Sequence, residues 1–250
     1  MKERVQNGFT LVEMSIVVLV IGFIVGAIFV GIDMRKNAQI HKISAKIQLF
    51  ETSRAGFHKK YYCYPGDCPN ATNYGLGANG DGNGIITDGG SPPAALFTGE
   101  ILNYWQHLVA GNFISEDLQT AQCPLIGITN ACISVAYVAS PPPQLTQPSG
   151  NFYLLNTDAR NPNTLPANPR NLIRITPEMM FGIDTKLDDG FPLQGEVRGY
   201  TSAGVDGSGT LQRFGFAGCS LPLAVANPRT YDITTDDTLC VGVVAFRRGL

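Results

Sequence analysis

The stretch Gly8-Phe9-Thr10-Leu11-Val12-Glu13 places a single carboxylate at the start of an apolar segment that ends at Asp33. The 19 residues from Met14 to Ile32 carry no charge. A helix of this length spans roughly 28 Å, about the thickness of the hydrocarbon core of a bilayer. Glu13 would then lie near one face of the membrane. Because an ionised carboxylate at that depth costs a few kcal/mol, Glu13 is expected to have a partner or a function.

Gly8, Phe9 and Glu13, preceded by basic residues and followed by the apolar segment, resemble the N-terminus of type IV prepilins and type II secretion pseudopilins. The resemblance covers about residues 4–31. In that family a membrane enzyme, the prepilin peptidase, cuts after the glycine on the cytoplasmic side, and the new N-terminal residue is N-methylated. The resemblance therefore implies that residues 1–8 are a leader and that the mature chain begins at Phe9.

A cut after Gly8 would leave a charged amine on Phe9, four residues before Glu13 and hence on the same helical face. In a filament, Glu13 of one subunit can meet the amine of a neighbour, so that two unfavourable charges become one pair that sets the axial register. The alternative is that Glu13 only reaches water near the helix end. The complete Gly8-to-Glu13 string favours the assembly role.

An ordinary secretory signal peptide is the competing interpretation of this terminus. Its apolar core should be about 7–15 residues long and should end at a small-residue cleavage site. Here the apolar segment is longer, and Gly26-Ala27-Ile28 makes a poor cleavage site. An uncleaved signal anchor stays open. Basic residues on both sides of the segment leave its orientation undecided by charge alone.

The helix is expected to continue beyond the membrane. The first proline of the chain is Pro65, and Ile40, Ile43 and Ile47 approximate a helical stripe with lysines on other faces. One helix from about Phe9 to His58 follows, with its second half packed on a sheet.

The predicted fold is α+β and pilin-like, with a long N-terminal helix and a loop-rich head built on an antiparallel sheet. Residues 9–33 would form the transmembrane and assembly half of the helix, and residues 34–250 the head. Shorter helices are expected at Thr98–Ala110 and from Thr176 to about Gly190. Strand-like runs lie at Asn151–Leu155, Leu172–Ile175, Gly195–Tyr200 and Cys240–Phe246.

Six cysteines follow the apolar segment, which indicates an oxidising compartment. Six cysteines allow 15 connectivities. Close spacing favours the pairs Cys63–Cys68, Cys123–Cys132 and Cys219–Cys240. The last pair resembles the C-terminal disulfide loop of many pilins.

The pattern Asn79-x-Asp81-x-Asn83-Gly84 resembles the first half of an EF-hand calcium loop. The second half departs from the pattern, because Gly90 occupies the position of the bidentate glutamate. An Asn- and Gly-rich turn without a metal is therefore the alternative. If calcium binds, which is the one cofactor the sequence suggests, the expected ligands are Asn79, Asp81, Asn83 and the carbonyl of Ile85, completed by Asp88 or Glu100.

Three further expectations concern charged and aromatic side chains of the head. Asp184, Asp188 and Asp189 are expected to form a solvated helix end or a cation site, with Lys186 or Arg198 as a salt partner. Trp105 is expected in the core, and His107 at the surface or as a helix cap.

The charge composition and the absence of catalytic motifs argue against two classes of function. The formal net charge is −2 and the sequence pI is about 5.9, so broad nucleic-acid binding is not expected. No G-x-S-x-G, H-E-x-x-H or G-x-x-x-x-G-K-[ST] motif is present, which argues against an enzyme.

The sequence therefore predicts a minor pilin or pseudopilin, a structural subunit of a type IV pilus or a type II secretion pseudopilus. An anchored adhesin or binding module and a DNA-uptake pilin are the alternatives. The expected partners are the prepilin peptidase, other pilins and the inner membrane. The chain would cross that membrane once, with its head in the periplasm, or at the cell surface if it is assembled into a pilus.

Overall fold

The structure is a computed structural model of the whole chain. It describes residues 10–87, 99–116, 118, 123–126, 131–138, 150–158, 175–192, 194–200, 204–205, 211–212, 219, 230–233 and 240–246. The chain divides into two compact units, residues 1–39 and 40–250. The predicted pilin-like α+β fold is confirmed: a long N-terminal apolar helix is followed by a head with a small antiparallel sheet.

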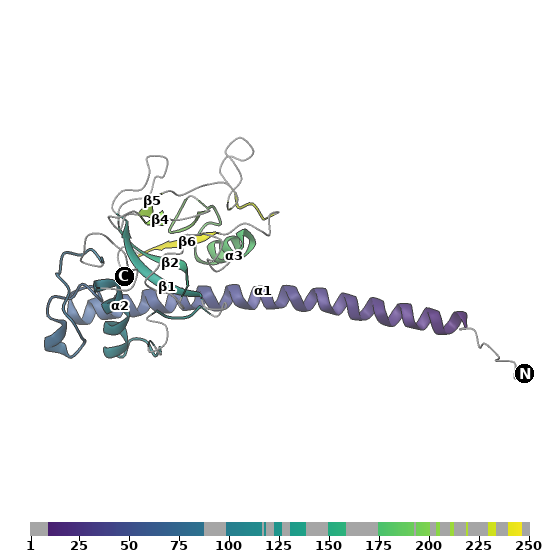
Figure 1. The fold of residues 1–250 in the computed structure, drawn as a ribbon, viewed down its shortest axis with the longest axis horizontal. Coiled ribbons are helices and arrows are strands. Elements are labelled where there is room, and N and C mark those ends of the chain that lie inside the picture. Colours follow the sequence, from purple (N-terminus) through teal and green to yellow (C-terminus); the bar gives the residue numbers. More distant parts are fainter. Residues whose placement is uncertain are drawn as a thin grey trace, which may run out of the picture. The chain divides into compact units, whose positions relative to one another are not determined.

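Helix α1 runs without interruption from Leu11 to Tyr61 (Figure 1). It begins with a capping box, in which the Thr10 hydroxyl accepts the Glu13 N–H at 3.2 Å and the Thr10 N–H donates to Glu13 Oε2 at 2.8 Å. Tyr62, the residue after the helix, donates its N–H to the carbonyl of His58 at 2.8 Å. The helix is continuous because no proline falls within it.

The second half of α1 belongs to the head and buries one face. Ile43, Phe50 and Phe57 are fully buried, and Ile40 and Ile47 are nearly so. Their spacing of three, four or seven residues places them on one stripe. Phe50 meets Trp105 in an edge-to-face contact with ring centroids 4.9 Å apart. The expected core position of Trp105 is thus the observed one.

The head sheet has the order β1-β2-β6-β3, with all neighbours antiparallel. Figure 1 shows the sheet and α3 on the same side of the second half of α1. Opposite residues include Phe152 with Ala245 and Val197 with Val244. A separate two-stranded ribbon pairs β4 with β5. The strands span Ala131–Val138 (β1), Gly150–Asp158 (β2), Val197–Tyr200 (β3), Gly204–Val205 (β4), Leu211–Gln212 (β5) and Val241–Ala245 (β6).

Three of the expected strands correspond to β2, β3 and β6, whereas β1 was not anticipated. Of the fourth expected strand only Ile175 is described, and it forms an isolated antiparallel bridge with Cys240. Two of the expected cysteine pairs are disulfides, Cys63–Cys68 and Cys219–Cys240. The side chain of Cys132 lies outside the described part, so its pairing with Cys123 stays a prediction.

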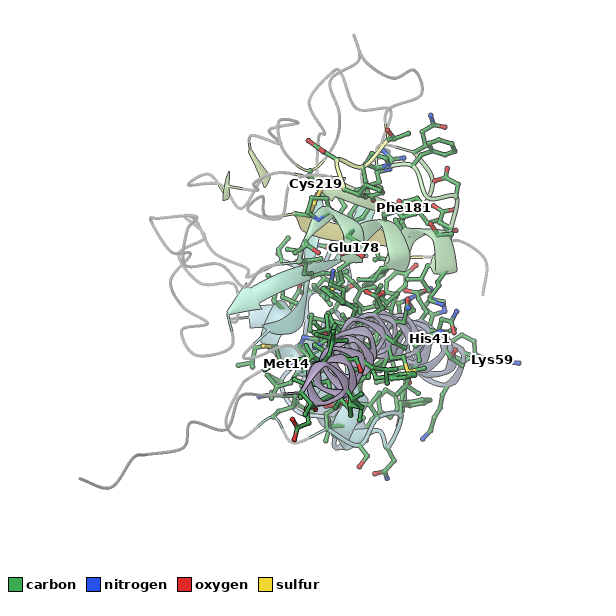
Figure 2. All side chains as sticks on the ribbon, turned by 90° about the vertical axis from the view of Figure 1, so that its right-hand side faces the viewer. Met14, His41, Lys59, Glu178, Phe181 and Cys219 are labelled. Carbon is green, nitrogen blue, oxygen red and sulfur yellow. A yellow bond between two sulfur atoms is a disulfide. The ribbon has the colours of Figure 1, made fainter. Side chains whose placement is uncertain are left out.

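The shorter helices are α2, Gly99–Ala110, and α3, Pro177–Leu187, with a 3₁₀ turn, η1, at Ala71–Tyr74. The Thr176 side chain caps α3 by accepting the Met179 N–H at 3.3 Å, and proline occupies the first turn, as the sequence indicated. Phe181 projects from α3 (Figure 2). The expected cap Thr98 of α2 lies outside the described residues.

The surface position expected for His107 is wrong. The side chain is fully buried beneath the loop that follows α1. Its Nδ1 accepts the Gly66 N–H at 2.9 Å, and its Nε2 lies 2.8 Å from the carbonyl oxygen of Ala78. These two partners fix the tautomer with the proton on Nε2. Burial lowers the pKa of His107, so the ring is neutral and ties the loop to α2.

The solvated helix end expected at Asp184 is also wrong. Asp184 is fully buried; its Oδ2 accepts the Tyr231 hydroxyl at 2.7 Å and its Oδ1 accepts the Gly190 N–H at 3.1 Å. Asp188 accepts the N–H groups of Glu196 and Val197.

The salt partner expected for this cluster is not formed within the described residues. The Lys186 ammonium lies 3.0 Å from Nε2 of His41, and Arg198 Nε donates to the carbonyl of Gly195 at 3.1 Å. One carboxylate oxygen each from Asp184, Asp188 and Asp189 lies within 4.8 Å of the others, so the alternative of a cation site stays a prediction. Burial raises the pKa of Asp184 to about 7 because it disfavours the charged form.

We expect Asp184→Asn to change how stability depends on pH. The folded state holds a proton that the unfolded chain, with a pKa near 3.8, releases. Stability from protonated Asp184 is therefore complete below about pH 4 and is lost as the pH rises through about 7. The stability of the asparagine variant relative to wild type should therefore rise between pH 4 and pH 8, by on the order of 2 kcal/mol after allowance for solvent screening.

The measurement is the melting temperature of both proteins between pH 4 and pH 8. Asp33→Asn, which changes an exposed acid of α1, is the control and should follow wild type. A difference between Asp184→Asn and wild type that stays constant across this pH range would contradict the assignment of the proton to Asp184.

Candidate assembly helix and acidic loop

The first half of α1 exposes apolar side chains along its whole length. Leu11 is 87%, Phe23 75% and Phe29 66% exposed. α1 is the one helix among the described residues that is long and apolar enough to cross a membrane, and its most apolar stretch has no buried residue. This surface has no partner within its own unit. Contact with water is unfavourable for it, so it calls for a bilayer or for other apolar helices.

Glu13 is the charged residue at the start of this surface. Its Oε2 accepts both the N–H and the hydroxyl of Thr10, each at 2.8 Å. Within the described residues, its other oxygen, Oε1, makes no hydrogen bond. A negative charge in the first turn is favourable, because it lies at the positive end of the helix dipole. Glu13 therefore caps its own helix with one oxygen and leaves the other available.

Gly8 and Phe9 lie outside the described residues, so the structure does not place the expected cut or the expected amine. The family model for a prokaryotic N-terminal methylation motif matches residues 4–29. The chain carries the hallmark of the type IV prepilin and pseudopilin family. No curated protein and no solved structure is significantly similar to the chain. The methylation motif belongs to a family of structural subunits that is not known for catalysis, and with α1 it fits a protein anchored in the inner membrane.

A second candidate site is the acidic loop, which we define as residues 62–87 together with Glu100 of α2. Asp67 is its centre and is 2% exposed. Asp67 Oδ1 accepts the N–H groups of Gly82 at 2.7 Å and Asn83 at 3.0 Å, and Oδ2 accepts that of Gly84 at 2.8 Å. One side chain thus holds three successive backbone amides.

Glu100 holds the other end of the loop. Its Oε1 accepts the Asp81 N–H at 2.9 Å, and its Oε2 accepts the Thr87 N–H at 3.1 Å. One carboxylate oxygen each from Asp67, Asp81 and Glu100 lies within 4.8 Å of the others. Burial raises the pKa of Asp67 and of Glu100, and the charge of Asp81 adds to both shifts.

The expected calcium ligands are only partly brought together. Asp81 and Glu100 meet, whereas Asn79 Oδ1 accepts the N–H of Thr72 at 2.9 Å and its hydroxyl at 3.1 Å. Asn83 Oδ1 accepts the N–H of Ile85 at 2.6 Å. The sixth expected residue, Asp88, lies outside the described residues.

Asp67 was not among the expected ligands, because it lies twelve residues before the EF-hand-like pattern. The chain reverses direction near the Cys63–Cys68 disulfide, and this reversal brings Asp67 next to the pattern. The available signal was the aspartate within that six-residue cysteine loop. Three carboxylates and nearby carbonyl oxygens are the donor types that calcium prefers. The donor set therefore suits the ion chemically, and calcium binding stays a prediction.

If calcium binds, millimolar calcium should raise the melting temperature of the full chain relative to excess chelator. The gain by mass action is about 2.7 kcal/mol when free calcium is 100 times its Kd. Asp81→Asn should abolish the shift, because it removes one of the three clustered charges. Asn79→Ala is the matched control and should keep the shift, because Asn79 is bonded to Thr72. No shift in wild type, or an equal shift in Asp81→Asn, would contradict calcium binding. The loop would then be an Asn- and Gly-rich turn without a metal.

Proposed function

We propose that this chain is a minor pilin or pseudopilin, processed after Gly8 and assembled into a pilus or pseudopilus through residues 9–33. The observation that carries the proposal is the methylation motif at residues 4–29 joined to a helix whose apolar side chains from Leu11 to Met34 are exposed. A soluble monomer cannot leave such a surface in water. The bilayer covers it before assembly, and the helices of neighbouring subunits cover it afterwards.

The charge of Glu13 supplies register within that apolar contact. Cleavage after Gly8 creates an ammonium group on Phe9, at the same end of the helix. In the filament the amine of one subunit lies against Glu13 Oε1 of its neighbour, while Oε2 keeps its bonds to Thr10. Both charges are then paired at a depth where each alone would be costly. Apolar packing supplies the cohesion, and the charge pair selects one axial offset.

The prepilin peptidase and other pilin-type subunits are the partners that this pathway requires. The head would lie in the periplasm, where the disulfides of the head can form and persist. In a pilus it would be displayed at the cell surface.

Glu13→Gln separates the charge of this residue from its capping role. Glutamine at the third helical position still completes a capping box, so the start of α1 and the folding of the head should be unchanged. The variant should be cleaved normally but enter filaments beside wild-type subunits at least about tenfold less efficiently, the effect of losing about 1.4 kcal/mol of pairing. Quantifying tagged variant subunits in sheared filaments or in a cross-linked pseudopilus measures this.

Asp33→Asn is the matched control, since it neutralises the acid at the other end of the apolar segment. It should assemble like wild type. Equal incorporation of Glu13→Gln and wild-type subunits would remove the register role, whereas failure of cleavage after Gly8 would remove the proposed function itself.

A further inference from the structure

A surface pocket of about 430 Å³ lies where α1 ends and the acidic loop begins. Four of the nine tyrosines of the chain line it, namely Tyr61, Tyr62, Tyr64 and Tyr74, together with His58. Its volume is in the range of small-molecule binding sites. A second pocket among the described residues of the head, between α1 and β3, has no aromatic side chain in its lining.

Tyr62 occupies a backbone conformation that a bulky residue rarely adopts. Its φ is 58°, in the left-handed region, at the position after the helix where glycine is usual. Its side chain is 87% exposed, so packing within the subunit does not offset the backbone cost. A strained position that keeps an exposed ring is a candidate for a role in binding.

The pocket is built on rigid supports. The Cys63–Cys68 disulfide closes the turn directly after Tyr62. Buried His107 holds Gly66 and Ala78, and Asp67 holds the amides of residues 82–84. The rings are therefore presented on a preorganised loop, which reduces the entropy lost when a ligand binds.

Charges around the pocket favour a neutral ligand. The Lys60 ammonium lies over the Tyr61 ring at 4.9 Å, and the Arg54 guanidinium lies over the Tyr64 ring at 5.9 Å. Both cations lie beside the pocket, so they repel a cationic ligand. An anionic ligand would meet Asp67, which lines the pocket, with Asp81 beside it.

The polar groups of the pocket favour a ligand rich in hydroxyl groups. Tyrosine hydroxyls, the Asn70 amide and the His58 imidazole each both donate and accept hydrogen bonds, as sugar hydroxyls do. Exposed aromatic faces complement the C–H face of a sugar ring. We propose that this pocket binds a neutral saccharide, stacked on the rings of Tyr62 and Tyr74. This goes beyond subunit assembly and does not depend on it.

A proline-rich peptide is the other ligand that aromatic grooves accept. Such a peptide offers carbonyl acceptors but few donors, because proline has no N–H. It could accept from the tyrosine hydroxyls, but it would leave their oxygens and the Asn70 carbonyl oxygen without a donor, whereas sugar hydroxyls both donate and accept. The geometry therefore favours the saccharide.

The test is saturation-transfer NMR on the full chain in lauryldimethylamine oxide, a detergent without a sugar headgroup. The probes are linear tetrasaccharides of α-linked glucose, β-linked glucose, mannose and N-acetylglucosamine. At least one should bind with a Kd of about 1 mM or tighter, with the strongest transfer to C–H protons on one ring face.

Tyr62→Gly is the decisive variant. Glycine suits the left-handed backbone, so the melting temperature should equal or exceed that of wild type, while saccharide affinity falls at least tenfold. Tyr74→Ala should lose affinity similarly. Phe181→Ala is the matched control, because it removes a 42% exposed ring on α3, outside the pocket. It should bind as wild type does.

Three outcomes would overturn the proposal. One is that no tetrasaccharide of the panel gives saturable transfer up to about 10 mM. Another is that Tyr62→Gly, folded and at least as stable as wild type, binds with unchanged affinity. The third is that a decaproline peptide saturates the pocket while all four saccharides fail, which would assign it to extended proline-rich chains.

Discussion

The exposed apolar surface of the first half of α1 requires an apolar environment outside its own unit. Residues 14–32 carry no charge, and their side chains are exposed within their own unit. Burial of apolar surface contributes roughly 25 cal/mol per Å², so a helix of this length gains much from any apolar environment. It gains almost equally from a bilayer and from neighbouring helices, so apolar burial alone would not select one axial offset in the assembly that we propose.

In the head, carboxylates fix the conformation of loop segments by accepting hydrogen bonds from backbone N–H groups. Asp67 holds three amides, and Glu100 and Asp188 hold two each. The acidic loop that Asp67 and Glu100 organise is rich in glycine and asparagine. A buried carboxylate bonded in this way satisfies several amides at once, whereas an unpaired buried amide would cost free energy.

The local features of the fold could be predicted from the sequence, and the tertiary ones could not. The long helix follows from an uninterrupted run without proline, and the start of α3 from Thr176 and Pro177. By contrast, the burial of His107 and Asp184 depends on loops that cover them from distant parts of the chain. Strand β1 was not predicted, and the burial of its residues Ile133 and Val135 is known only from the structure.

The candidate sites divide in the same way. Glu13 and the methylation motif are contiguous in sequence and need no fold to be found. Asp67 joins Asp81 and Glu100 only through chain reversal, and the aromatic pocket needs both the end of α1 and the loop after it. A motif with fixed spacing can be read from the chain alone, but a site assembled by folding needs the coordinates.

The mass of the N-terminal peptide, from protein purified out of membranes or filaments, shows whether the leader is removed after Gly8. We expect a chain that begins at Phe9 and carries one additional methyl group on its amine, and a Gly8→Leu variant that keeps its leader. A wild-type chain that retains Met1, or one cut near Ala27, would contradict this expectation.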